Sequence, residues 1–288
     1  MAEKASWGFD EGDDIVPGRS ALRRLGGGSQ YEVYLAWDSH LLSVAVVKVR
    51  RPDRIEDGSA RAGLEREAET LARLNHPVVV RMFDATLDGD RPHLLLEHLD
   101  GPTLSRLLRK YGPLEPAQLL PLALSLCSAL HYLAEERTVH LDVKPSNVVM
   151  GAPPRLVDLS VARTLEDAAR LTRTVGTAGY MAPEQCDPVG RGPVGALADV
   201  WGLGVTMYEA VTRTRAFRVS DDEKCPQAHV DPAPVPEEVP AQIAEVIGAC
   251  LRVDPVQRPS AGELAERLEP LVASIKRPPL RRRRPRLR

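Results

Sequence analysis

Several residue types are scarce in this chain, and each scarcity excludes a class of protein. The 288 residues include only four cysteines, without a C-x-x-C pair, which argues against a zinc site or a disulfide scaffold and favours a reducing, cytoplasmic setting. No apolar run approaches the roughly 18 residues that span a bilayer. The acidic first 14 residues lack the apolar core of a signal peptide. We therefore expect a protein without a transmembrane segment.

Lysine is also scarce, since it supplies only six of the 38 basic residues. This shortage makes two well-placed lysines, Lys48 and Lys144, more informative. The net charge is −2, but residues 276–288 carry +8, so the remainder carries −10. This tail cannot bury enough apolar surface to fold alone. It is either a solvated end or a site for nucleic acid, an acidic partner or an anionic membrane surface, where contact would be peripheral.

The most informative stretch is residues 139–149, where Asp142, Lys144 and Asn147 lie between short apolar runs. Asp158 follows at the end of another apolar run. We interpret the stretch as a polar loop between two strands, with side chains that point into a common space. Magnesium prefers carboxylate and amide oxygens together with substrate phosphates, and a carboxylate near a hydroxyl can accept its proton. Asp142 alone is better explained as a solvated loop residue, whereas the spaced set is not.

A glycine cluster at residues 26–28 leads into an alternating strand, and a second strand at residues 44–49 carries Lys48 on the face opposite its valine neighbours. Glycines let backbone N–H groups approach phosphate oxygens, although such a cluster alone is more typical of a hairpin turn. A lysine inside an apolar strand is costly unless it is paired. The next segment, residues 60–74, has helical periodicity and would supply the partner.

This order of features resembles protein kinases, and in particular the bacterial branch of eukaryotic-like serine/threonine kinases. H-x-D-x-K-x-x-N at residues 140–147 and D-x-x at 158–160 are similar to the catalytic loop and the metal-binding segment. G-T-x-x-Y-x-A-P-E at 176–184 and D-x-W-x-x-G at 199–204 are similar to the end of the activation segment and to the central helix of the lower lobe. The resemblance covers about residues 19–272.

The resemblance implies transfer of the γ-phosphate of MgATP to serine or threonine hydroxyls. Asp142 would be the catalytic base, and Lys144 would steady the transferring phosphate. Asn147 and Asp158 would hold Mg2+.

ATP would lie between the glycine cluster and the catalytic loop. Glu67 would hold Lys48 against its phosphates as a further catalytic pair, with Glu65 and Glu69 as nearby alternatives. Backbone groups at residues 97–99 would bond the edge of the adenine. The nucleotide-binding residues would be Leu25, Gly26, Gly28, Val33, Val46, Lys48, Glu97, Leu99 and Val149.

The segment from residue 158 to residue 184 has little regular pattern, and loops of this length are usually functional or disordered. By resemblance, Thr177 would bond near Asp142, Glu184 would form a buried pair with Arg258, and Asp199 would cap the catalytic-loop backbone. The activation-segment residues would be Thr172, Thr174, Thr177 and Glu184, and the structural residues Asp199 and Arg258.

The implied fold is α+β: a bilobal protein-kinase fold with a small antiparallel β-sheet N-lobe that holds one key helix, and a larger, mostly helical C-lobe. The predicted parts are a disordered acidic arm, an N-lobe, a C-lobe and a disordered basic tail, over residues 1–18, 19–99, 100–275 and 276–288. Ser260 and Glu263 form a capping box. The predicted strands include 78–83 and 93–96, and the predicted helices are 60–74, 115–136, 196–211, 241–251 and 260–271.

Four positions depart from the family pattern. Tyr31 replaces the third glycine of the loop, and Val46 replaces the alanine that contacts adenine. Leu141 replaces the arginine that faces a phosphate on the activation loop. Ser160 replaces the glycine of D-F-G and loses its backbone freedom.

Three functions compete. The first is an active serine/threonine protein kinase with protein substrates, itself included. The second is a pseudokinase-like nucleotide-binding scaffold with weak or no phosphotransfer, favoured by Val46 and Ser160. The third is a small-molecule phosphotransferase, against which the peptide-docking motifs at residues 182–184 and 199–204 argue. We predict the first, because every charged or amide residue that the chemistry needs is present.

Overall fold

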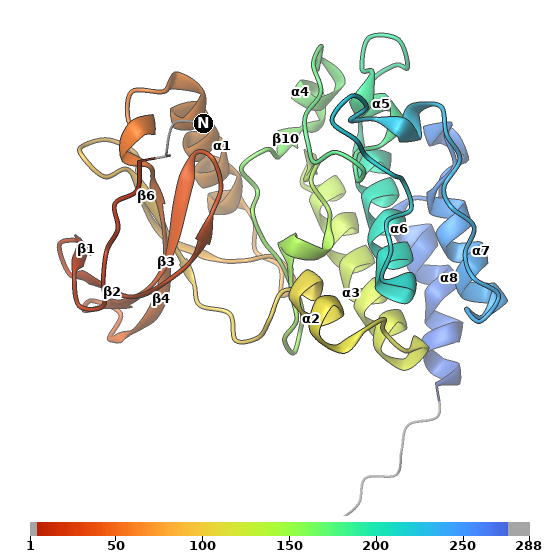
Figure 1. Ribbon diagram of the computed structural model, residues 1–288, viewed down its shortest axis with the longest axis horizontal. Helices are drawn as coiled ribbons and strands as arrows, with labels where there is room; N and C mark the ends of the chain where they lie inside the picture. Colours follow the sequence, from red (N-terminus) through yellow and green to blue (C-terminus); the bar gives the residue numbers. More distant parts are fainter. Residues whose placement is uncertain (1–4, 276–288) are drawn as a thin grey trace, which may run out of the picture.

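The structure, a computed structural model, describes residues 5–275. An antiparallel sheet with one helix lies beside a larger group of helices (Figure 1), which confirms the predicted bilobal α+β fold. The predictions for the basic tail lie outside the described residues. The strands are β1 (Asp14–Val16), β2 (Arg19–Gly27), β3 (Tyr31–Asp38), β4 (Ser43–Arg50), β5 (Met82–Thr86), β6 (His93–Glu97), β7 (Thr138–Val139), β8 (Val148–Val149), β9 (Arg155–Leu156) and β10 (Arg163–Thr164). The helices are α1 (Gly58–Arg73), α2 (Leu104–Tyr111), α3 (Pro116–Glu135), α4 (Leu165–Ala169), α5 (Pro183–Cys186), α6 (Ala196–Thr212), α7 (Ala241–Cys250) and α8 (Ala261–Ser274).

The main sheet has the strand order β1-β2-β3-β4-β6-β5, and its central strands β3, β4 and β6 are buried on both faces. Alternation along β4 sends Val47 and Val49 to an outer apolar cluster, while Lys48 points to the opposite face. On that inner face, Leu64 and Leu71 of α1 join the main core. The sheet therefore needs a cover on its outer side as well as on the side of α1.

The N-terminal segment provides that outer cover, so the prediction of a disordered arm is wrong for residues 5–18. β1 pairs with β2, and Ile15 is fully buried. Trp7 and Phe9 pack against the outer cluster. The acidic composition suggested disorder, but two aromatic side chains and Ile15 bury enough apolar surface to dock the segment on the sheet.

Element boundaries differ from the predicted ones at a few places. Helix α1 starts at Gly58 because the Asp57 side chain accepts the N–H groups of Ser59 and Ala60 as an N-cap. The predicted strand 78–83 has the wrong bounds, since β5 begins only at Met82 and ends at Thr86. The long segment after Asp158 contains β10 and α4. The capping box at the start of α8 is confirmed.

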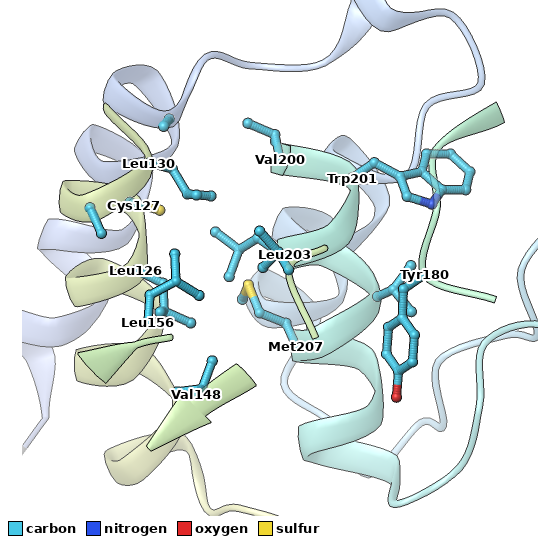
Figure 2. Packing of buried hydrophobic residues seen from close by; sticks show 14 of the residues in the cluster. Leu126, Cys127, Leu130, Val148, Leu156, Tyr180, Val200, Trp201, Leu203 and Met207 are labelled. Atoms are coloured by element: carbon cyan, nitrogen blue, oxygen red, sulfur yellow. The ribbon is translucent and has the colours of Figure 1, made fainter. Parts of the chain in front are cut away.

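The core of the helical lobe lies between α3 and α6. Figure 2 shows Leu126 and Leu130 of α3 facing Leu203 and Met207 of α6. Within residues 5–275, α3 is the one helix long and apolar enough to cross a membrane, which corrects the expectation that no stretch reaches this length. Because it packs against both α6 and α8, we interpret it as a core helix.

Candidate active site

The catalytic loop between β7 and β8 is anchored from beneath by helix α6. Asp199 near the start of α6 accepts the backbone N–H groups of His140 and Leu141, each at 2.7 Å. Burial raises the pKa of Asp199 to about 6, although these hydrogen bonds favour the charged form. Leu141 adopts a left-handed conformation with φ 65°. The cap therefore holds a strained turn that presents Asp142.

Asp142 is held by three donors, two from its own loop and one from the activation segment. Its Oδ1 accepts a hydrogen bond from Thr177 Oγ1 at 2.6 Å. Its Oδ2 accepts from Lys144 Nζ at 2.6 Å and from Asn147 Nδ2 at 3.1 Å. Lys144 Nζ also lies 2.6 Å from Thr177 Oγ1. The loop and the activation segment therefore fix the direction of one carboxylate beside one ammonium.

Lys48 bridges the two sides of the site. Its Nζ donates to Glu67 Oε2 at 2.7 Å and to Asp158 Oδ1 at 2.8 Å. Burial disfavours the ammonium, but the two carboxylates outweigh it and raise the pKa of Lys48. Glu67 is the partner among the three candidate glutamates: Glu65 pairs with Arg61 at 2.8 Å, and Glu69 is exposed.

The oxygens that remain suit a magnesium ion. Asp158 uses Oδ1 for Lys48, and 40 % of its side chain is exposed. Asn147 uses its Nδ2 for Asp142, so its amide oxygen is turned away from that carboxylate. The Asn147 backbone oxygen accepts from Val157 N at 2.9 Å, which ties the two candidate ligands together. Carboxylate and amide oxygens are the donor types that Mg2+ takes, so these residues fit the ion.

Ser160 does not disturb Asp158 in the way its replacement of glycine suggested. The left-handed backbone falls on Asp158 itself, with φ 67°, rather than on Ser160. The ammonium of Lys48 is the largest cause of the low pKa of the Asp158 carboxyl, and the nearby side chain of Ser160 lowers it further. In this conformation, serine therefore supplies a contact and loses no needed freedom.

The predicted nucleotide residues lie on the glycine-rich end of β2, on β3, β4 and β8, and at and after the end of β6. Val33, Val46, Leu99 and Val149 are half-buried, and Leu25 is exposed at the start of the glycine cluster. Glycine is required at position 27, which the sequence reasoning did not single out. A Cβ there would lie 2.5 Å from the Tyr31 carbonyl oxygen, and φ is 149°. The Glu97 side chain accepts the N–H of Arg81 at 2.8 Å, which fixes the end of β6.

Tyr31 has a role that sequence reasoning missed. Its hydroxyl donates to the carbonyl of Ala60 in α1 at 2.7 Å, and its ring centroid lies 4.9 Å from Lys48 Nζ. Burial raises the pKa of Tyr31 to about 12. A Cβ on Gly63 would lie 2.7 Å from the hydroxyl, so the helix leaves room for it. The tyrosine thus joins the glycine-rich loop to α1 on the inner face of the sheet.

Gln185 is a second residue that the sequence reasoning missed. Its Nε2 donates to the carbonyls of Leu141 and Val175, both at 2.9 Å. It thereby links the catalytic loop to the activation segment. Next to it, Glu184 forms a bidentate pair with Arg258, with N–O distances of 2.6 and 2.8 Å. This pair is the one that the resemblance implied.

Comparison with known proteins agrees with this geometry. Serine/threonine-protein kinase PknB of Mycobacterium leprae is 35% identical over 74% of this chain, and PkaA of Streptomyces coelicolor is 36% identical over 80%. PknD of Mycobacterium tuberculosis is 34% identical over 85%. The aligned part is 35–43% of the length of these relatives. Residues 19–268 match the protein kinase domain, and the chain therefore belongs to the protein kinase family.

Proposed function

We propose that this chain is a serine/threonine protein kinase that transfers the γ-phosphate of MgATP to hydroxyls of proteins, itself included. One observation carries the proposal. Lys48 joins Glu67 and Asp158, and the Asn147 beside Asp158 joins Asp142, so the groups that the chemistry needs form one continuous site. We place the nucleotide between an N-lobe over residues 19–99 and a C-lobe over residues 100–275.

Each residue of the site has a distinct task in this proposal. Asp142 would orient the attacking hydroxyl and accept its proton, and Lys144 beside it would offset negative charge on the transferring group. Lys48, fixed by Glu67, would contact the phosphates. Bound Mg2+ would be held by Asn147 and Asp158 and would supply positive charge against the phosphate oxygens.

Incubation with labelled MgATP tests the proposal. We expect incorporation of label into the chain or an added protein, and mass spectrometry should place it on serine or threonine. Label on tyrosine alone would contradict the assignment. Absence of label in a wild-type chain that binds ATP would favour the alternative, a non-catalytic nucleotide-binding scaffold, for which Val46 and the position of Tyr31 against Lys48 speak.

Val46 allows a direct test of the adenine pocket. Valine carries two methyl groups more than alanine, and overpacking of a fitted site costs about 1–3 kcal/mol. We expect Val46→Ala to lower the dissociation constant for ATP by about five- to 150-fold, measured by calorimetry. Val44→Ala, on the same strand and also half-buried, is the control and should leave it unchanged. Equal affinities of wild type and Val46→Ala would reject the overpacking.

Loop phosphorylation is expected to matter little, since Leu141 provides no guanidinium. Thr172 and Thr174 are both exposed and accessible to modification. We expect the Thr172→Ala/Thr174→Ala variant to keep most of the wild-type rate in a peptide phosphorylation assay. Loss of most of the activity would instead indicate that other cations take the phosphate. Arg163 is the first of these cations to test. Burial and the nearby Arg66 and Arg173 lower its pKa, and a phosphate group would offset this cluster of positive charge.

Two finer proposals concern the partners of this chain. The first is that its substrates are proteins, which follows from the kinase assignment. The +8 charge of residues 276–288 would suit nucleic acid, an acidic protein or an anionic membrane surface, and would place a cytoplasmic chain peripherally at such a membrane.

A further inference from the structure

The segment of residues 5–9, here named the N-terminal strap, lies across the outer face of the sheet. Trp7 Nε1 donates to the carbonyl of Arg50 at 2.6 Å. The Trp7 and Phe9 rings stack at 5.9 Å, and Phe9 meets the edge of Tyr34 at 5.4 Å. The guanidinium of Arg91 covers both strap rings at 5.1 and 5.0 Å. The strap is therefore docked by packing and by directed contacts.

Below the strap lies a buried carboxylate that the catalytic proposal does not use. Glu32 of β3 is 0% exposed and accepts the N–H of Trp7 at 3.2 Å and the hydroxyl of Tyr34 at 2.7 Å. Its Oε1 pairs with Arg51 at 3.1 Å and with Arg24 at 3.2 Å. Burial opposes the charge, but the hydrogen bonds outweigh burial and lower the pKa of Glu32. Removal of one partner would leave this buried charge uncompensated, so Glu32 ties Trp7, Tyr34 and Arg51 together.

Arg51 connects this carboxylate and the strap to the glycine-rich loop. Its Nη1 donates to the carbonyl of Ala5 at 2.8 Å. Its Nε donates to the carbonyl of Gly28 at 2.9 Å, and its backbone N–H donates to the carbonyl of Gln30 at 3.0 Å. One guanidinium, itself buried, thus touches the strap, Glu32 and the loop that would cover the phosphates of ATP.

We propose that the strap is a positioning element for the nucleotide, with Arg51 and Glu32 as its positioning residues. Residues 25–29 are exposed and contain three consecutive glycines, so a free loop would lose much conformational entropy on closing over a ligand. Contacts that hold Gly28 and Gln30 beforehand reduce this loss and raise affinity. This proposal takes from the proposed function only that the ligand is MgATP.

The test compares Arg51→Met with Arg54→Met. Arg54 lies three residues further on, and its side chain pairs with Asp53 and Asp57, so the control removes the same charge without touching the loop. In the nucleotide-free protein, we expect the amides of residues 26–31 to exchange with deuterium about tenfold faster in Arg51→Met and as in wild type in Arg54→Met. The dissociation constant for MgATP should rise by about three- to tenfold only in Arg51→Met, with an unchanged KM for a peptide substrate.

Trp7→Ala supplies an independent variant should Arg51→Met fold poorly. It removes the indole that docks the strap on the sheet and leaves Arg51 in place. We expect the same faster exchange and the same weaker binding of MgATP. Trp7→Phe should show both effects more weakly. Unchanged exchange in residues 26–31, together with a lowered melting temperature, would overturn the proposal and leave the strap a purely structural cover. If wild type does not bind MgATP, the kinase assignment fails, while the exchange experiment still decides the role of the strap.

Discussion

Replacement of Asp142 by asparagine is expected to lower the rate of phosphotransfer by about 10²–10⁴-fold, the usual contribution of general base catalysis. An amide cannot accept the proton of the attacking hydroxyl. It also turns a donor group toward Lys144 or Thr177, each now 2.6 Å from a carboxylate oxygen. Initial rates with saturating MgATP and a peptide substrate measure the effect.

The prediction requires that only the chemical step changes. Asp142→Asn should therefore bind MgATP within about threefold of wild type, because Lys48 and Asp158 are untouched. Asp231→Asn, which removes an exposed carboxylate from a loop, is the matched control and should keep the wild-type rate. Activity of Asp142→Asn above one tenth of wild type would mean that another group takes the proton or that Asp142 only orients the substrate.

The charged residues of the site could be predicted because burial leaves few choices for them. A lysine in an apolar strand needs a carboxylate, and the helix that follows offers three. Leu64, Ala68 and Leu71 mark the buried face of α1, and Glu67 lies on that face three residues after Leu64. Helical periodicity is therefore consistent with Glu67 as the partner of Lys48, but it was the resemblance to protein kinases that singled Glu67 out from Glu65 and Glu69.

The strap could not be predicted from its own five residues, which have no periodicity and are followed by an acidic stretch. A signal was nevertheless present elsewhere, since residues 44–49 are apolar at every position but Lys48. A strand that is apolar in both alternating positions is buried on both faces, and something must cover each one. The aromatic residues Trp7 and Phe9, two apart, are suited to lie on one side of an extended segment.

Tyr31 and residues 78–80 were not predictable for a different reason, because distant chain decides both. In the sequence, Tyr31 is only a replacement of a glycine. Its contact depends on α1, which provides the Ala60 carbonyl and the space beside Gly63. The run Val78-Val79-Val80 predicts a strand, yet it forms only an isolated parallel β-bridge between Val79 and Leu156. Val80 N donates to the carbonyl of Leu156 at 3.0 Å. The pairing partner of this run is therefore a distant segment of the chain, which the run itself does not reveal.

Replacement of Arg258 by methionine is expected to lower the free energy of unfolding by about 3–5 kcal/mol, the usual cost of leaving one partner of a buried ion pair. Arg258 is 4% exposed and Glu184 is 1% exposed. All five N–H groups of the guanidinium are used. Two meet Glu184, and the others donate to backbone carbonyls of Arg252, Leu197 and Val253 at 2.7–3.1 Å. The indole of Trp201 lies 5.0 Å away.

Chemical denaturation of three variants separates the charge from the hydrogen bonds. Arg258→Lys keeps the charge but has three donors in place of a planar fork. We therefore expect its free energy of unfolding to lie between those of wild type and Arg258→Met. The Glu184→Gln/Arg258→Met double variant removes the unpaired charge and should be more stable than Arg258→Met alone. Arg61→Met removes an exposed pair and should leave the midpoint unchanged. If the double variant is less stable than Arg258→Met, an unpaired Glu184 carboxylate is not what destabilises Arg258→Met, and the ion-pair explanation fails.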